Sequence, residues 1–197
     1  SCVWKMPTNE KVIYLSFDDG PHPIATPFVL EQLDKYNAKA SFFCIGDNIY
    51  KHPEIMNQVI ADGHLIGNHT FNHLRGWKTE NELYHENFLK CEAWINQHQG
   101  AIRGQKPKFR PPHGRIKKVQ TKKILASHEI VMWDVLTGDF SQNISPETVL
   151  QKSIQYTESG SIVVFHDSIK ANRNMSYALP RYLAHFKEKG FEFRSLV

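Results

Sequence analysis

The sequence contains little cysteine and no long apolar run, and both shortages exclude classes of protein. Three cysteines at wide spacing, Cys2, Cys44 and Cys91, are an odd number, which argues against a disulfide framework or a CxxC metal site. No stretch approaches the roughly 20 apolar residues that a membrane-spanning helix needs, so we expect no membrane span. Because the sequence starts at Ser1 rather than at Met, we make no prediction about the cellular compartment.

The sequence also lacks a cluster of positive charge, although its formal net charge is +4. The lysines and arginines are scattered among acids rather than grouped with interleaved aromatic residues, so we expect no nucleic-acid partner. Linkers, internal repeats and low-complexity segments are missing as well. Since 197 residues suit one α/β domain, we predict a single domain over residues 1–197.

Short runs rich in β-branched and aromatic residues alternate with longer segments of helical period. The predicted strands are Val12 to Phe17, Ala40 to Ile45, His64 to Asn68, Lys108 to Arg110, Ile130 to Val135, Ser161 to His166 and Phe191 to Leu196. The predicted helices are Pro27 to Tyr36, Pro53 to Asp62, Glu80 to Gln99, a segment after Gly114, a segment after Ser145 and Tyr177 to Lys189. This alternation predicts a mainly parallel sheet, either as a barrel or as a doubly wound sheet.

Polar residues suited to catalysis stand at the C-terminal ends of these predicted strands, where ligands bind in both architectures. Asp18 and Asp19 follow the first strand in the stretch Ser16-Phe17-Asp18-Asp19-Gly20-Pro21. Read alone, the two acids are about as consistent with a turn as with a site. Since neighbouring strand residues point to opposite faces, two acids in a site would serve different partners, one a cation and the other a proton.

A pair of histidines follows the third predicted strand in the stretch His69-Thr70-Phe71-Asn72-His73. If this segment is helical, the two imidazoles share a face and can bind one divalent metal. The spacing alone is a weak signal, because the chain has 11 histidines. Together with a carboxylate from another strand end, however, two histidines leave coordination positions open, as catalytic metal sites do.

Two further strand ends carry partners that the acids would need. Arg110 opens the stiff stretch Arg110-Pro111-Pro112-His113-Gly114, which can aim the His113 amide at a developing negative charge while Arg110 pairs with a carboxylate. His166 ends an apolar strand, and Asp139 is a candidate to raise its pKa. Each motif alone also fits a surface turn or a capping histidine. The polar segment from Ser168 to Met175 is expected to form a rim of the site.

Taken together and in this order, the five motifs resemble the polysaccharide deacetylase family, which is the NodB homology domain of carbohydrate esterase family 4. The resemblance extends over roughly Val12 to Leu196. It implies a distorted (β/α) barrel, usually with seven strands. It also implies a metal-dependent hydrolase that removes acetyl groups from N-acetylated glycans, such as chitin-like oligomers or peptidoglycan. Members of this family are often extracytoplasmic.

The resemblance assigns the metal and the base to the first two motifs. Asp19, His69 and His73 are the implied ligands of a divalent metal, for which we favour zinc, while cobalt, nickel and manganese also suit such a ligand set. Asp18 is the implied catalytic base, which takes a proton from the metal-bound water that attacks the acetyl carbonyl.

The remaining motifs supply the other implied roles. Arg110 orients the base, and the backbone amide of His113 helps to bind the oxyanion. His166 is the general acid that protonates the departing amine, and Asp139 supports it.

The sequence departs from the family pattern at three motifs. His113 stands where the family usually has Tyr or Phe, and Leu136 and Phe140 stand where it often has Asp and Trp. Val164 replaces the usual Leu and is still apolar enough to receive an acetyl methyl group, so Val164 and Phe140 are expected to contact the substrate. These departures leave the glycan open. An O-acetyl esterase acting on acetylated xylan and a carbohydrate-binding domain without turnover remain alternatives.

Overall fold

Seven parallel strands form one curved sheet in the order β5-β4-β3-β2-β1-β7-β6, and an eighth strand, β8, pairs with β1 outside this order. The computed structural model describes residues 1–99 and 104–197. The architecture is the distorted (β/α) barrel that the family resemblance implies. The strands are β1 (Val12–Asp18), β2 (Ala40–Cys44), β3 (Leu65–Asn68), β4 (Lys108–Phe109), β5 (Glu129–Ile130), β6 (Val135–Leu136), β7 (Ile162–His166) and β8 (Glu192–Phe193).

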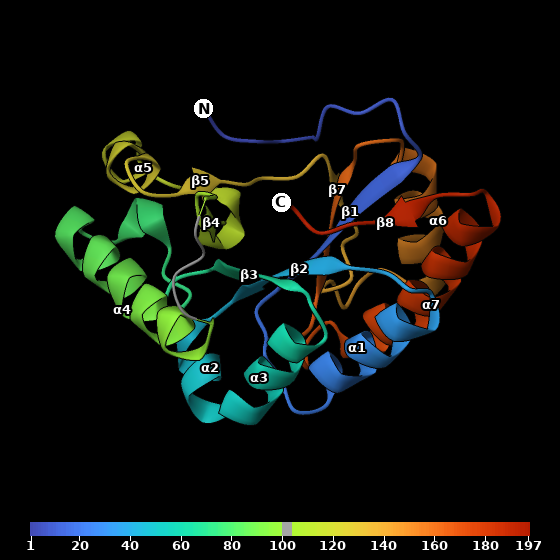
Figure 1. The fold of residues 1–197 in the computed structure, drawn as a ribbon, viewed down its shortest axis with the longest axis horizontal. Helices are drawn as coiled ribbons and strands as arrows, with labels where there is room; N and C mark the ends of the chain where they lie inside the picture. Colours follow the sequence, from blue (N-terminus) through green and yellow to red (C-terminus); the bar gives the residue numbers. More distant parts are fainter. Residues whose placement is uncertain (100–103) are drawn as a thin grey trace.

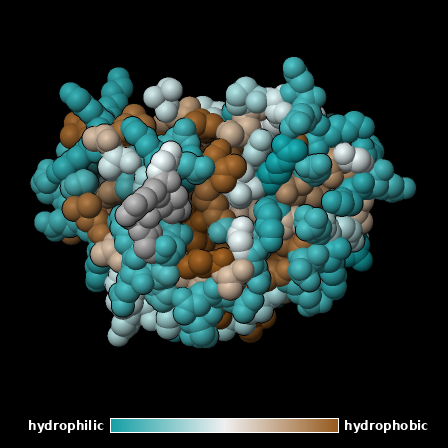
Figure 2. Space-filling model, viewed as in Figure 1, coloured by the Kyte–Doolittle hydropathy of each residue, from teal (hydrophilic) through white to brown (hydrophobic). Residues whose placement is uncertain are grey.

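The helices lie on the outside of the curved sheet (Figure 1). In that view α4 and α5 lie on one side, α6 and α7 on the other, and α1 and α3 between them. Figure 2 shows hydrophilic residues over most of the same face, with apolar residues gathered near its middle. No helix in the described residues is long and apolar enough to span a membrane. The helices are α1 (Ala25–Lys35), α2 (Gly46–Lys51), α3 (Pro53–Ala61), α4 (Asn81–Gln99), α5 (Lys118–Leu125), α6 (Pro146–Tyr156) and α7 (Asn172–Glu188).

The central strand β1 is buried along almost its whole length, which explains its nearly continuous apolar sequence. The Phe17 ring stacks on Phe42 of β2 at 5.1 Å and on Phe165 of β7 at 6.0 Å between ring centroids. Asp18, the next residue, is held in register beside His166 of β7. The core therefore fixes the end of β1, where the predicted base stands, against its neighbouring strand.

The strand predicted from Ile130 to Val135 is wrong, because the structure divides this segment into two strands. β5 ends at Ile130 and β6 begins at Val135, and the two lie at opposite edges of the sheet. The barrel is therefore open between them. The N-terminal segment runs across this opening, where Val3 N–H donates to Ile130 O at 2.9 Å and Met132 N–H donates to Val3 O at 2.7 Å.

One helix is absent from the sequence predictions, and another begins well before its predicted start. Helix α2 was not predicted, and α7 begins at Asn172 rather than at Tyr177, so the second half of the polar segment from Ser168 to Met175 is helical. Asn174 shows why the helix extends over polar residues. Its side-chain amide donates to the carbonyls of Asp139 and Ser141, and these tertiary contacts stabilise the first turn of α7.

Candidate active site

A cavity of about 590 Å³ opens at the C-terminal ends of the strands. Eight of the ten predicted site residues line it, while Arg110 and Asp139 lie buried behind the wall. Trp133 also contributes to the wall, and no sequence motif marks it as a site residue. The lining residues are Asp18, Asp19, His69, His73, His113, Trp133, Leu136, Phe140, Val164, His166, Ser168, Ile169 and Lys170.

The three predicted metal ligands converge on one point of this cavity. Asp19 Oδ1 lies 3.6 Å from His69 Nε2 and 3.2 Å from His73 Nε2, and the three ligand atoms lie within 4.8 Å of one another. Asp19 Oδ1 is buried and has no hydrogen-bond partner among the described residues. Because buried carboxylate oxygens are normally paired, this orphaned oxygen between two imidazole nitrogens fits a divalent cation.

Both imidazoles are in the form that a metal requires. Burial lowers the pKa of His69 and of His73 to about 4, so both rings are neutral at pH 7. His69 Nδ1 lies 2.7 Å from the carbonyl oxygen of Arg110, which can only accept a hydrogen bond. The proton of His69 therefore resides on Nδ1, and the lone pair of Nε2 faces Asp19.

The segment that carries both histidines is a loop, which is different from the helix considered for the HxxxH spacing. Thr70 and His73 have positive φ angles of 65° and 54°, in the left-handed region that non-glycine residues seldom adopt. The backbone reverses at these two positions, and the rings of His69 and His73 come within 5.0 Å of each other between centroids. The rings converge because of this irregular loop rather than because of helical periodicity.

Side chains from α4 hold this strained loop in place. Asn87 Oδ1 accepts hydrogen bonds from the backbone amides of Phe71 and Asn72, both at 2.9 Å. Asn68, at the end of β3, donates from Nδ2 to Glu92 at 2.9 Å. These bonds fix the loop from behind, so the metal ligands are preorganised by residues that line no part of the cavity.

Asp18 is tied to Arg110 beneath the cavity. Arg110 is fully buried, and its Nη1 donates to Asp18 Oδ1 and to Ser16 Oγ, both at 2.7 Å. The rest of the guanidinium donates to the carbonyls of Val131 and Met132, at 3.1 and 2.9 Å. These bonds occupy the two carbonyls in the opening between β5 and β6, which explains why the predicted strand is interrupted there.

The ion pair decides the charge of Asp18. Burial alone would raise the pKa of Asp18, but the Arg110 guanidinium, together with His69 and His166, outweighs it and holds the pKa below its ordinary value. Asp18 is therefore ionised at neutral pH. Its second oxygen, Oδ2, lies 3.9 Å from His69 Nε2, beside the candidate metal position.

His166 faces Asp18 from the neighbouring strand and carries the opposite charge. Its Nδ1 lies 2.7 Å from Asp139 Oδ1, and its backbone amide donates to Asp139 Oδ2 at 2.7 Å. Burial would lower the pKa of His166, but the Asp139 carboxylate, together with Asp19 and Asp18, outweighs it and raises the pKa to about 9. Because Nδ1 donates to Asp139, the second proton of the imidazolium resides on Nε2.

The wall opposite His166 is formed by the turn after β4. His113 has φ 59°, and its ring lies 4.7 Å from His73 and 5.5 Å from Trp77 between centroids. Gly114 follows with φ 63°, and a Cβ there would lie 2.4 Å from the Trp133 ring. Only glycine fits this position. The Trp133 ring can therefore pack against the turn only because residue 114 has no side chain.

Asp167, which has no predicted role, anchors the turn that carries Asp19. Its Oδ1 accepts a hydrogen bond from Gly20 N–H at 3.0 Å, and its Oδ2 accepts one from the Thr26 hydroxyl at 2.7 Å. A Cβ on Gly20 would lie 2.0 Å from the Asp167 carboxylate. Burial raises the pKa of Asp167 to about 8. Gly20 is therefore needed so that this buried carboxyl group can approach the turn.

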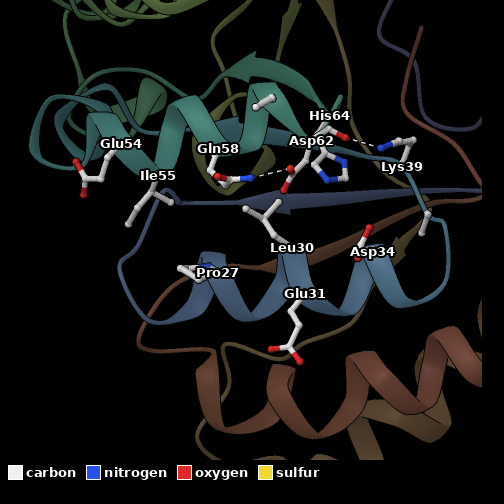
Figure 3. A pocket seen from close by; sticks show the side chains of 12 residues that line it. Pro27, Leu30, Glu31, Asp34, Lys39, Glu54, Ile55, Gln58, Asp62 and His64 are labelled. Carbon is white, nitrogen blue, oxygen red and sulfur yellow. Dashed lines mark hydrogen bonds between the residues drawn. The ribbon is translucent and has the colours of Figure 1, made fainter.

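A second cavity, of about 670 Å³, lies between α1 and α3 (Figure 3). Its lining includes Leu30, His64 and the acidic residues Glu31, Asp34 and Glu54. None of the predicted site residues lines it. The site residues predicted from the sequence therefore gather at the cavity at the strand ends, not at this second cavity.

Comparison with known proteins agrees with the geometry of the site. The family model described as polysaccharide deacetylase matches residues 5–133. A peptidoglycan-N-acetylglucosamine deacetylase of Bacillus cereus is 34% identical over 198 residues, covering 97% of this chain and 89% of the relative. A chitooligosaccharide deacetylase of Azorhizobium caulinodans is 31% identical over 205 residues, covering 95% of this chain and 94% of the relative.

Solved structures share the fold over nearly the whole chain. The Bc1960 peptidoglycan N-acetylglucosamine deacetylase superposes with a TM-score of 0.91 and 31% identity, covering 98% of this chain and 90% of the other. BA3943 of Bacillus anthracis, a CE4 family pseudoenzyme, superposes with a TM-score of 0.87 at 21% identity, covering 100% and 67%. The fold alone therefore does not guarantee turnover, which depends on the residues of the site. From the family match and these relatives, the chain belongs to the polysaccharide deacetylase family.

Proposed function

We propose that the protein is a metal-dependent hydrolase that removes acetyl groups from N-acetylated glycans. One observation carries the proposal: an ionised Asp18 and a protonated His166 face the same cavity, next to the convergent Asp19, His69 and His73. A base, an acid and a metal ligand set are the groups that amide hydrolysis needs. The deacetylase names of the relatives support the same reaction and the same class of substrate.

Asp19, His69 and His73 are the residues that would hold the cation. Neutral imidazoles and a carboxylate accept zinc, which we favour, and also cobalt, nickel or manganese. When bound, the cation supplies a Lewis acid that polarises the acetyl carbonyl and makes water more acidic.

The chain's own residues would move the two protons. Asp18 is ionised and accepts the proton of the attacking water, while Arg110 holds one of its oxygens and leaves the other, Oδ2, toward the ligand set. His166 donates its Nε2 proton to the nitrogen that leaves, and Asp139 keeps that proton in place until then. Each proton transfer is expected to contribute on the order of 10²- to 10⁴-fold to the rate.

The walls would position the acetyl group between these residues. Val164 is fully buried in the middle of β7, and it lines the cavity with Phe140, whose ring meets His166 edge-on at 5.1 Å between centroids. We assign the methyl group of the acetyl to this apolar side. The backbone amide of His113 is assigned to the oxyanion, because the turn after β4 brings His113 to the opposite wall.

Two alternatives differ from this proposal, one in its substrate and the other in its lack of turnover. An O-acetyl esterase would use the same residues, so only the substrate distinguishes it. A carbohydrate-binding domain would have no need for an ionised base and a protonated acid that face each other. Burying the carboxylates of Asp18 and Asp139 beneath the cavity is unfavourable, because both groups lose their hydration. A role in proton transfer accounts for keeping both groups there.

The test is acetate release from N-acetylglucosamine oligomers, peptidoglycan and acetylated xylan, with and without a chelator. We expect release from an N-acetylated glycan, its loss on chelation and its return when zinc is added. Release from xylan alone would favour the esterase. If the metal-replete protein released acetate from none of these substrates, the proposal would fail.

A further inference from the structure

The second cavity, between α1 and α3, lies in a different part of the molecule from the active site (Figure 3). Its lining shares no residue with the cavity at the strand ends. Lys39 and His64, which both line it, directly precede β2 and β3, so the second cavity reaches the edge of the sheet where these strands begin. The active site lies where the strands end. A small molecule bound in the second cavity therefore leaves the active site free.

His64 is a buried side chain of this lining with an unused hydrogen-bond donor. It is only 9% exposed, and its ring is directed from the start of β3 toward α1 (Figure 3). Its Nδ1 accepts a hydrogen bond from the backbone amide of Ala40 at 3.2 Å. Burial, with a contribution from Lys39, lowers the pKa of His64 to about 4 against an opposing contribution from Asp62. The ring is therefore neutral with its proton on Nε2, and this N–H has no protein partner among the described residues.

The lining is acidic, and two of its acids are free. Asp34 of α1 and Glu54 of α3 are exposed, and neither forms a salt bridge within residues 1–99 and 104–197. Lys39 is the one lysine of the lining in the part of the chain that the structure describes, and its ammonium donates to the backbone carbonyl of Asp62. The cavity therefore attracts a cation and repels an anion. The four acids of the lining are Glu31, Asp34, Glu54 and Asp62.

These acids do not form a metal site. Among the described residues, Asp19, His69 and His73 are the one group of three or more ligand residues close enough to share an ion. The free nitrogen of His64 carries a proton, so it donates a hydrogen bond and offers no lone pair to a metal. The cavity therefore suits an organic cation that also carries a hydrogen-bond acceptor.

Apolar side chains complete the lining. Leu30 and Ala38 are buried, and Pro27 and Ile55 lie farther along the two helices (Figure 3). The volume of about 670 Å³ is in the range of small-molecule sites, which combine an apolar surface with a few polar groups. An apolar surface beside a hydrogen-bond donor and free carboxylates suits a sugar ring, because such a ring has C–H faces and polar substituents at its edge.

We propose that the second cavity binds glucosamine residues, the deacetylated units that the proposed reaction leaves in the glycan. A glucosamine residue carries an ammonium for Asp34 and Glu54, hydroxyl oxygens that accept from His64, and C–H groups that pack on Leu30. An N-acetylated residue has no ammonium, so the cavity distinguishes product from substrate. The protein is thereby retained on chains that it has begun to deacetylate. This inference rests on the proposed function, which identifies the product, although binding itself needs no turnover.

The experiment measures the binding of three probes by calorimetry at about pH 6, where sugar amines are largely protonated and His64 is still neutral. A glucosamine tetramer offers ammonium and hydroxyl groups, cellotetraose offers the same rings with hydroxyl groups alone, and spermine offers ammonium groups alone. We expect the glucosamine tetramer to bind at least about tenfold more tightly than either of the other two. Its advantage over cellotetraose should shrink at about 0.5 M salt, because exposed charges are then screened within a few ångströms.

Paired variants identify the cavity. Asp34→Asn/Glu54→Gln should weaken binding of the glucosamine tetramer by about three- to tenfold, the range expected for the loss of two exposed ion pairs. Glu147→Gln/Glu188→Gln is the matched control, because these exposed acids lie in the first turn of α6 and the last turn of α7 and form no salt bridge among the described residues. The control changes the net charge equally and should bind like the wild type. Thermal unfolding checks that both variants are folded.

The outcomes separate this inference from the proposed function. If the glucosamine tetramer bound no more tightly than cellotetraose or spermine, the inference would be overturned, and acetate release would decide the proposed function independently. Equal losses of affinity in the two double variants would place the sugar elsewhere and would also overturn it. Glucosamine binding as expected, without acetate release from any N-acetylated glycan, would overturn the proposed function and leave the cavity as an amino-sugar site.

Discussion

Replacing Asp139 by Asn should lower the alkaline limit of activity, because Asp139 keeps the proton on His166. The carboxylate accepts hydrogen bonds from both the ring and the backbone amide of His166, and it helps to raise the pKa of His166 from 6.5 to about 9. The Asn amide has no charge and only one acceptor oxygen. Burial, which lowers the pKa of the imidazole, is then opposed only by the charges of Asp19 and Asp18.

The size of the effect follows from this pKa. The difference between 6.5 and about 9 corresponds to about 3 kcal/mol in favour of the protonated ring in the folded protein. If the pKa of His166 falls to about 6.5 or lower, the protonated fraction at pH 8 falls from about nine-tenths to about 3%. The expected loss in kcat/KM at pH 8 is therefore roughly 30-fold, and it should be much smaller at pH 6.

The assay is acetate release as a function of pH, at equal metal loading of both proteins. Unfolding in urea gives a readout without activity. Because the folded pKa of His166 lies above its unfolded value, the stabilisation by the pair is complete below pH 6.5 and is lost as the pH rises through about 9. The metal-free wild type should lose stability over this window, and Asp139→Asn should lose much less.

Asp134→Asn is the matched control for this prediction. Asp134 is also a carboxylate near a strand end, but it accepts hydrogen bonds from Ser161 and Ile162 and does not contact His166. Its substitution should leave the alkaline limit of activity where it is in the wild type. An Asp139→Asn protein with the wild-type alkaline limit would refute the role assigned to Asp139.

Two further substitutions test the groups behind the cavity. Arg110→Met should lower the free energy of unfolding by about 3–5 kcal/mol at pH 7, because it leaves the buried Asp18 without a partner. A loss under about 1 kcal/mol in urea unfolding would contradict the ion-pair assignment. Asn87→Ala should weaken metal binding by about tenfold in competition with a chromophoric chelator, since it frees the loop of the histidine ligands. Asn57→Ala, on α3, is its control, and equal affinities of the two variants would argue against a positioning role for Asn87.

The sequence predicted those parts of the fold that depend on local pattern. β1 and β7 are buried parallel strands, so their continuous apolar runs identify them, and the polar residue that ends each run marks the edge of the sheet where the site forms. Asp18 and His166 could therefore be placed together before the structure was known. Their charges could not, because these depend on the contacts with Arg110 and Asp139 across the fold.

Features that depend on contacts between distant segments were not predictable. The break between β5 and β6 reflects hydrogen bonds from Arg110 and from the N-terminal segment, and no local pattern encodes them. The loop of His69 and His73 takes positive φ angles where the spacing suggested a helix, because Asn87 of α4 holds it. Trp133 reaches the cavity for a similar reason, since the absence of a side chain at Gly114 leaves room for its ring.

The most direct test of the central claim measures bound metal and acetate release in one sample of Asp18→Asn. Asp18 is assigned to the proton of the attacking water, and Asp19 is assigned to the metal. The account predicts wild-type metal content, cooperative thermal unfolding and a rate at least about 10²-fold below that of the wild type. A rate close to that of the wild type in the folded, metal-loaded variant would contradict the assignment of Asp18 as the base.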